Sequence, residues 1–140
     1  MNNKIIPLSV FAMVILFFTA CKQQPSTDLT KAEFIPKPVS VKAAGGSFKI
    51  SGSTKIYYQE GTEGLQQVAE YLSEELNNIA MIKPVVQVTN KIPRKGIYLT
   101  ITNEDSKLGN EGYELIIGKK LIIINATAPS GNFYGIQTLL

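Results

Sequence analysis

The stretch GYELIIGKKLIIIN, residues 112–125, decides the fold. Gly118-Lys119 is typical of a tight hairpin turn, so Gly112–Ile117 and Lys120–Asn125 are predicted to pair as antiparallel strands. A strand with one wet face should alternate polar and apolar residues. The second strand is apolar on both faces, so we expect both of its sides to be covered. A helix would cover one side, and the last helix or a domain outside this chain would cover the other.

A helix is predicted directly after this hairpin. Pro129 and Ser130 form a start signal, with the Ser130 hydroxyl as the expected N-cap acceptor. Phe133, Ile136 and Leu140 then fall at i, i+3 and i+7, on one helical face. Neither a glycine nor a basic last turn ends the helix. We therefore expect these 140 residues to be the front end of a longer protein.

A longer amphipathic helix is predicted upstream, opened by Gly61-Thr62. Apolar residues recur on one of its faces, at Leu65, Val68, Ala69, Leu72, Leu76 and Ile79. The other side carries Glu63, Glu70, Glu74 and Glu75. We interpret these glutamates as a solvated helix face, with a binding or catalytic cluster as the alternative.

The remaining segments indicate short strands. They are Pro38–Val41 and Ser47–Ile50 around a turn at Ala43–Gly46, then Lys55–Tyr58, Pro84–Val88 and Ile97–Ile101, with a polar loop at Asn103–Asn110. The order of strands, helix, strands and helix predicts an α+β domain. Its sheet should be small and mixed or mostly antiparallel, with the helices packed on one side.

The N-terminus has the pattern of a secretory signal. Residues 1–18 combine a short basic start with an apolar run that is shorter than the roughly 20 residues of a membrane span. Phe18–Cys21 resembles a bacterial lipobox, and Cys21 is the only cysteine. We expect a lipoprotein signal peptide at 1–20 and lipidation of Cys21; an ordinary signal peptide with a chance cysteine is the alternative. Lys22 follows instead of an aspartate, so we expect an anchor in a bacterial outer membrane, facing the periplasm or the exterior.

Composition excludes several kinds of site. Histidine is absent and Cys21 is the only thiol, which removes the usual zinc ligands, the base of a Ser or Cys triad and any disulfide. We therefore expect no metal and no cofactor. The net charge is +3 and the basic residues are scattered, so no nucleic-acid partner is indicated. Residues 21–37 are interpreted as a tether, 38–128 as the α+β domain and 129–140 as a helix leading into a missing domain.

Three segments resemble the domain that precedes the catalytic barrel in glycoside hydrolase family 20, the β-N-acetylhexosaminidases. Gly112–Leu115, Leu121–Ala126 and Ser130–Leu140 are similar to that family's Gly-Tyr-x-Leu strand, apolar strand and Gly-x-Phe-Tyr-Gly-x-Gln-Thr-Leu-Leu helix. Ile35–Pro38 is similar to the family's opening, and the resemblance extends from Ile35 to Leu140. Related accessory domains precede barrels in hyaluronidase-like and glucuronidase-like families, so a sister family stays open as an alternative.

The resemblance implies an enzyme that removes terminal β-linked N-acetylhexosamine with retention, and with the N-terminal signal it predicts that this enzyme is secreted and lipid-anchored. In this family the acetamido oxygen of the substrate attacks the anomeric carbon, a glutamate is the general acid and a neighbouring aspartate orients the acetamido group. That Asp-Glu pair lies in the barrel. Glu104-Asp105 has the opposite order, so no catalytic residue is assigned, and the chain alone is expected to be inactive. The implied partners are the glycan substrate of the whole protein, its own barrel and the membrane. A non-enzymatic surface lipoprotein that binds glycan or protein is the remaining alternative.

The last helix is predicted to dock at the seam between the two domains. Gly131 and Gly135 share a helix face, and a mid-helix glycine costs about 1 kcal/mol relative to alanine, so another backbone is expected to approach there. The predicted docking set is Gly131, Phe133, Tyr134, Gly135, Ile136, Gln137 and Leu140. For Tyr134 and Gln137 a sugar-contacting role is the alternative to packing.

Overall fold

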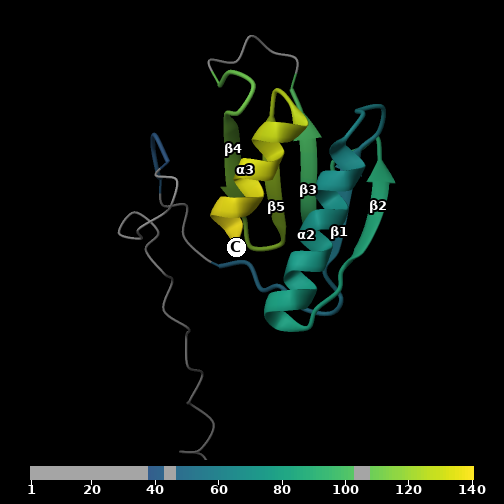
Figure 1. Cartoon of the computed structure of the whole chain (residues 1–140). Coiled ribbons are helices and arrows are strands. Elements are labelled where there is room, and N and C mark those ends of the chain that lie inside the picture. The colour runs from purple at the N-terminus through teal and green to yellow at the C-terminus, as the bar shows by residue number, and fades with distance from the viewer. Residues whose placement is uncertain (1–37, 43–46, 103–107) are drawn as a thin grey trace, which may run out of the picture.

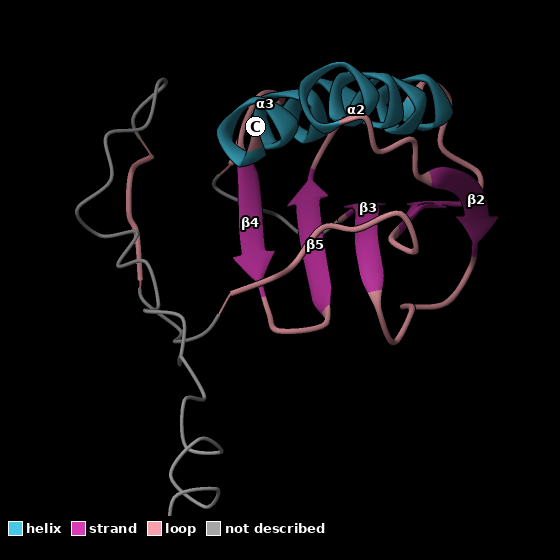
Figure 2. Cartoon of the chain, turned by 90° about the horizontal axis from the view of Figure 1, so that it is seen from below, coloured by secondary structure: helices cyan, strands magenta, loops and turns pink. Residues whose placement is uncertain are grey.

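Two helices cover one face of a five-stranded sheet in the computed structural model, which describes residues 38–42, 47–102 and 108–140 (Figures 1 and 2). The predicted α+β class with helices on one side is confirmed. The elements are β1 (Lys55–Gln59), α2 (Leu65–Ala80), β2 (Val85–Thr89), β3 (Gly96–Ile101), β4 (Tyr113–Ile117), β5 (Leu121–Ala126) and α3 (Pro129–Leu139).

The sheet has the strand order β2-β1-β3-β5-β4. β1 pairs in parallel with β2 and β3, β3 pairs in parallel with β5, and the β4–β5 hairpin is antiparallel. The sheet is therefore mixed, as predicted, but its parallel pairings outnumber the antiparallel one. The α2 crossover returns the chain from the end of β1 to the start of β2, which makes that pair parallel.

The core lies between the sheet and the two helices. The strand register aligns Ile56, Ile97 and Ile122 in one row, and all three are buried under the helices. The buried apolar side chains that the helices add are Leu65, Ala69, Leu72 and Leu76 from α2 and Ile136 from α3. The predicted helical stripe is confirmed except at Ile79, which lies in the last turn of α2 and is 64% exposed.

The two faces of β5 differ more than its apolar sequence indicates. Ile122, Ile124 and Ala126 are buried beneath the helices, whereas Leu121 and Ile123 on the opposite face are half-buried. The last helix does not cover that opposite face, because α3 lies on the same side of the sheet as α2 (Figure 2). Residues 90–95, which connect β2 to β3, run on the side away from the helices (Figure 2).

The two N-terminal strands were predicted wrongly. Residues 38–41 and 47–50 have no ladder partner, and the predicted turn at 43–46 lies outside the described residues. Phe48 and Ile50 still pack against the core from an irregular segment. A tight turn separates this segment from β1, which begins at Lys55. The turn is closed by the Thr54 N–H, which donates to the Ser51 carbonyl at 2.9 Å. Alternating apolar residues therefore occur in a loop that packs against the core as well as in a strand.

Several element boundaries differ from those predicted. The Gly118 N–H donates to the Leu121 carbonyl at 2.9 Å, so Lys119-Lys120 forms the hairpin turn and the predicted turn is one residue too early. α2 begins at Leu65 after left-handed Gly64, later than Gly61-Thr62 indicates. α3 has Pro129 in its first turn and Ala128 as the N-cap residue, so the prediction of Ser130 as N-cap was wrong.

Among the described residues, no helix is long and apolar enough to span a bilayer. The signal segment, Cys21 and the tether up to residue 37 lie outside the described residues, as does Glu104-Asp105.

Candidate docking surface on the helical layer

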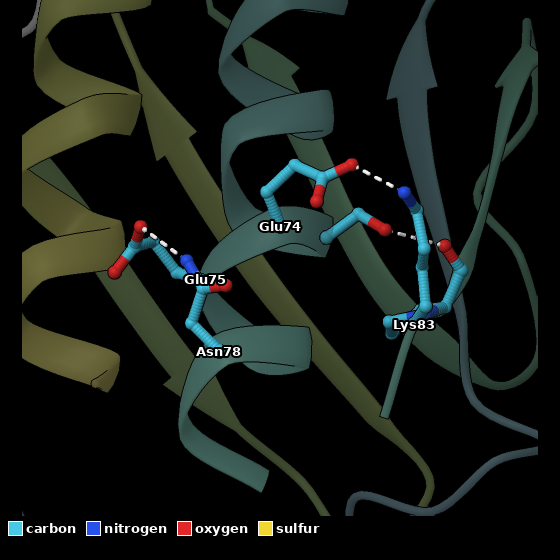
Figure 3. Close-up of polar contacts among 6 residues, drawn as sticks. Glu74, Glu75, Asn78 and Lys83 are labelled. Atoms are coloured by element: carbon cyan, nitrogen blue, oxygen red, sulfur yellow. Dashed lines mark hydrogen bonds and ion pairs between the residues drawn. The ribbon is translucent and has the colours of Figure 1, made fainter. Parts of the chain in front are cut away.

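The glutamates of α2 behave as a solvated helix face. Glu74 forms an ion pair with Lys83, with 2.5 Å between the carboxylate oxygen and Nζ, and both side chains are more than half exposed. Glu75 accepts a hydrogen bond from Asn78 at 3.4 Å one turn later on the same helix (Figure 3). Exposed pairs of this kind contribute at most about 1 kcal/mol. Within residues 38–42, 47–102 and 108–140, no group of three potential metal ligands occurs.

A shallow groove runs between α2 and the edge strand β2. It is lined by Glu70, Ser73, Glu74, Lys83, Pro84, Val85 and Val86. The Ser73 hydroxyl, which is buried, donates to the Pro84 carbonyl at 2.7 Å, and Glu74 is paired with Lys83. Because these polar groups satisfy one another, the groove has no free nucleophile paired with a base.

Three of the predicted docking residues face the domain's own sheet. A Cβ on Gly131 would meet the Gly112 carbonyl oxygen and, at 2.8 Å, the Cβ of Ala126. A Cβ on Gly135 would meet the Ile124 side chain and, at 3.2 Å, the Tyr113 ring. Gly131, Gly135 and Ile136 are all buried. The two glycines thus let α3 lie directly on the β4–β5 hairpin.

The other four docking residues lie nearer the surface of the helical layer. Phe133 is 37% and Leu140 is 43% exposed, while Tyr134 and Gln137 are half-buried. The ring of Phe133 lies between two others, with centroid distances of 5.2 Å to Tyr71 of α2 and 5.8 Å to Tyr134. The Gln137 side-chain amide donates to the Tyr71 hydroxyl at 2.9 Å. We call these five residues, Tyr71, Phe133, Tyr134, Gln137 and Leu140, the aromatic ridge.

Most of the aromatic ridge comes from a helix without charged residues. α3 reads PSGNFYGIQTL and has no charged side chain, although part of its circumference is exposed. A helix facing water on one side normally carries charges there. The exposed large apolar residues of α3 and of the position that adjoins it are Phe133 and Leu140, and exposed apolar groups that lie close together are typical of a protein contact.

Asn132 is a residue that the sequence analysis missed. It is fully buried in α3, where its side-chain N–H donates to the Thr100 carbonyl at 3.1 Å. Its Oδ1 is buried with no hydrogen-bond partner. In the sequence it is one of several polar residues of α3, beside Ser130, Gln137 and Thr138, and nothing in that pattern distinguishes a buried from an exposed amide.

The start of α3 is tied to the preceding loop. The Ser130 hydroxyl donates to the Asn110 carbonyl at 2.7 Å, and the Thr127 hydroxyl donates to the Gly109 carbonyl at 2.5 Å. The Tyr113 and Thr138 hydroxyls lie 2.5 Å apart near the other end of the helix. Both ends of α3 are therefore fixed to the β4 region.

Known proteins match this chain in sequence and in fold. Residues 31–140 match the family model described as glycosyl hydrolase family 20, domain 2. A beta-hexosaminidase of Porphyromonas gingivalis is 28% identical over 106 residues, which are 76% of this chain and 13% of that protein.

Solved structures agree with the family match. The GH20 beta-N-acetylhexosaminidase of Streptomyces coelicolor A3(2) superposes with a TM-score of 0.66 at 28% identity, covering 83% of this chain and 22% of that one. The N-acetyl-beta-hexosaminidase of Streptomyces plicatus gives 0.67 at 30% identity, covering 82% and 21%. This chain thus spans about a fifth of the length of these structures, and no (β/α)8 barrel is among its described residues. The sequence match and the shared fold together place the chain in glycoside hydrolase family 20, as the accessory domain that the family model calls domain 2.

Proposed function

We propose that this chain is the accessory domain of a β-N-acetylhexosaminidase that removes terminal β-linked N-acetylhexosamine from glycans. The observation that carries the proposal is the family match over residues 31–140, supported by a fold shared with β-hexosaminidases at 28–30% identity. In such an enzyme the substrate's acetamido oxygen attacks the anomeric carbon, with a barrel glutamate as general acid. This chain supplies no reacting group.

The role of this domain is structural support of the barrel. We propose that Phe133, Tyr134, Gln137 and Leu140 contact the barrel. They lie on the uncharged α3 or directly after it, and each is exposed or half-buried. Gly131, Gly135 and Ile136 act indirectly, since they fix α3 on the β4–β5 hairpin and so set the position of the exposed residues.

We propose that the gene encodes a longer product that includes a barrel, because this chain spans about a fifth of the length of its relatives. The activity is tested with two proteins, the 140-residue chain and this longer product. We expect the longer product to hydrolyse an aryl β-N-acetylglucosaminide, because it would contain the Asp-Glu pair. The 140-residue chain should give only the rate of an empty-vector preparation. Turnover by the chain alone, or a longer product without turnover, would contradict the proposal.

We also propose that Cys21 anchors the protein to a bacterial membrane through lipid. The support is the lipobox-like Phe18–Cys21 and the short apolar run before it. Each buried CH₂ of an acyl chain contributes about 0.8 kcal/mol, and stable anchoring takes more than one chain. Cys21→Ser should move the protein from the membrane fraction to the released fraction, whereas Ser26→Ala in the tether should leave it in the membrane. A Cys21→Ser protein that stays in the membrane fraction would refute the anchor.

A further inference from the structure

The C-terminal end of α2 has a backbone conformation that its residue does not favour. Met81 caps the helix at φ 55° and ψ 30°, and within residues 38–42, 47–102 and 108–140 it is the only non-glycine residue with positive φ. Its N–H donates to the Asn77 carbonyl at 2.9 Å, so this conformation closes the helix. Glycine is the usual residue at such a cap, because it has no Cβ to strain.

The domain itself does not hold the Met81 side chain. Met81 is 93% exposed, and Ile79 two residues before it is 64% exposed. A strained backbone persists where surrounding contacts or function require it, and the described domain supplies no such contact to this side chain. Methionine is suited to irregular apolar gaps, because it is long, unbranched and polarizable. Met81 and Ile79 together form what we call the α2 corner.

We infer that the α2 corner inserts into an apolar pocket on the catalytic barrel of the same protein, an inference that rests on the proposed function. α2 and α3 run side by side and end at the same end of the domain (Figure 1). The corner therefore extends the helical layer that carries the aromatic ridge, which ends at the exposed Leu140.

The size of the relatives and the charges near the corner favour the barrel as its partner. The chain covers 22% of the Streptomyces coelicolor structure, so most of such a protein is available to cover the helical layer. An anionic membrane surface would call for free basic residues beside the apolar ones. The last turn of α2 has no basic residue, and nearby Lys83 is paired with Glu74.

The substitution Met81→Gly tests the inference through effects of opposite sign in two proteins. In the 140-residue chain it should raise the midpoint of thermal unfolding by about 2–4 °C, because the strained cap is relieved and no contact is lost. In the longer gene product it should remove a contact between domains, so a protease should separate the two domains at least about threefold faster. Ile92→Ser is the matched control, since Ile92 is 69% exposed but belongs to the connection between β2 and β3 and not to the helical layer. It should change the cleavage rate by less than about 1.5-fold.

Each other outcome has a defined meaning. A lower midpoint for the Met81→Gly chain would overturn the inference, because the side chain would then already stabilise the isolated domain. An unchanged cleavage rate in a longer product that hydrolyses the aryl glucosaminide would overturn it while leaving the proposed function intact. Sedimentation of the 140-residue chain tests whether a second copy binds the corner. If the chain formed a dimer that Met81→Gly abolished, the corner would contact a second copy, and the inference would again be overturned. A longer product without any hydrolysis would instead contradict the proposed function.

Discussion

Replacing Asn132 by aspartate should lower the free energy of unfolding by at least about 3 kcal/mol at pH 7. The side chain is fully buried, its N–H donates to the Thr100 carbonyl, and its Oδ1 has no partner. Aspartate would place a carboxylate there, remove the donor and turn an oxygen lone pair toward the Thr100 carbonyl. The site is near the start of α3, where the helix dipole favours a negative charge by at most about 1 kcal/mol when partly exposed. Desolvation of the unpaired charge is the larger effect.

Chemical denaturation of the purified chain, followed by circular dichroism, measures this loss. Asn90→Asp makes the same chemical change at an exposed position and should shift stability by no more than about 0.5 kcal/mol. An Asn132→Asp chain that loses less than about 1 kcal/mol would show that water or another donor reaches this side chain.

Replacing Gly131 by alanine should cost about 2–3 kcal/mol of stability. Alanine is the better helix former by about 1 kcal/mol, so helix propensity alone predicts a gain. The added Cβ would, however, meet the Gly112 carbonyl oxygen and lie 2.8 Å from the Ala126 Cβ. Both atoms belong to the β4–β5 region and neither can rotate away, so α3 must shift off the sheet. The steric cost should therefore exceed the gain in propensity.

Gly52→Ala is the matched control for this substitution. A Cβ at Gly52 meets nothing within 4 Å, and its φ is not in the left-handed region. Its stability should change by less than about 0.5 kcal/mol, or rise slightly through a less flexible unfolded chain. If Gly131→Ala proved as harmless as Gly52→Ala under the same denaturation, α3 would not be in close contact with the hairpin.

The predictable parts of this domain are those whose pattern is local. The apolar residues of α2 recur over several helical turns, and a tight turn links β4 directly to β5. These local patterns are long enough to predict the type of each element and the face that it buries. The strands predicted at 38–41 and 47–50 failed because alternation over four residues does not supply a neighbouring strand. The predicted N-cap of α3 was two residues too late, at Ser130 instead of Ala128. Pro129, with its fixed φ, already occupies the first turn of the helix.

In α3, too, the sequence predicts some features and only the structure shows the others. Its spacing correctly indicates that Gly131 and Gly135 share a face, but it does not say which backbone approaches that face. The structure gives this face to the domain's own hairpin and leaves Phe133 and Leu140 exposed. It also buries Asn132, whose amide has the same sequence signal as an exposed one.

By itself the sequence determined the fold class, the amphipathic helix, the hairpin and the resemblance to family 20, because these depend on short-range periodicity and on a contiguous motif. Only the tertiary structure decided that most strand pairings are parallel, that the β4–β5 hairpin lies under Gly131 and Gly135, and that Met81 takes a strained, exposed position. Strand order and register depend on contacts between residues far apart in the chain. Those contacts are chosen by how whole faces pack together, which no local pattern of residues encodes.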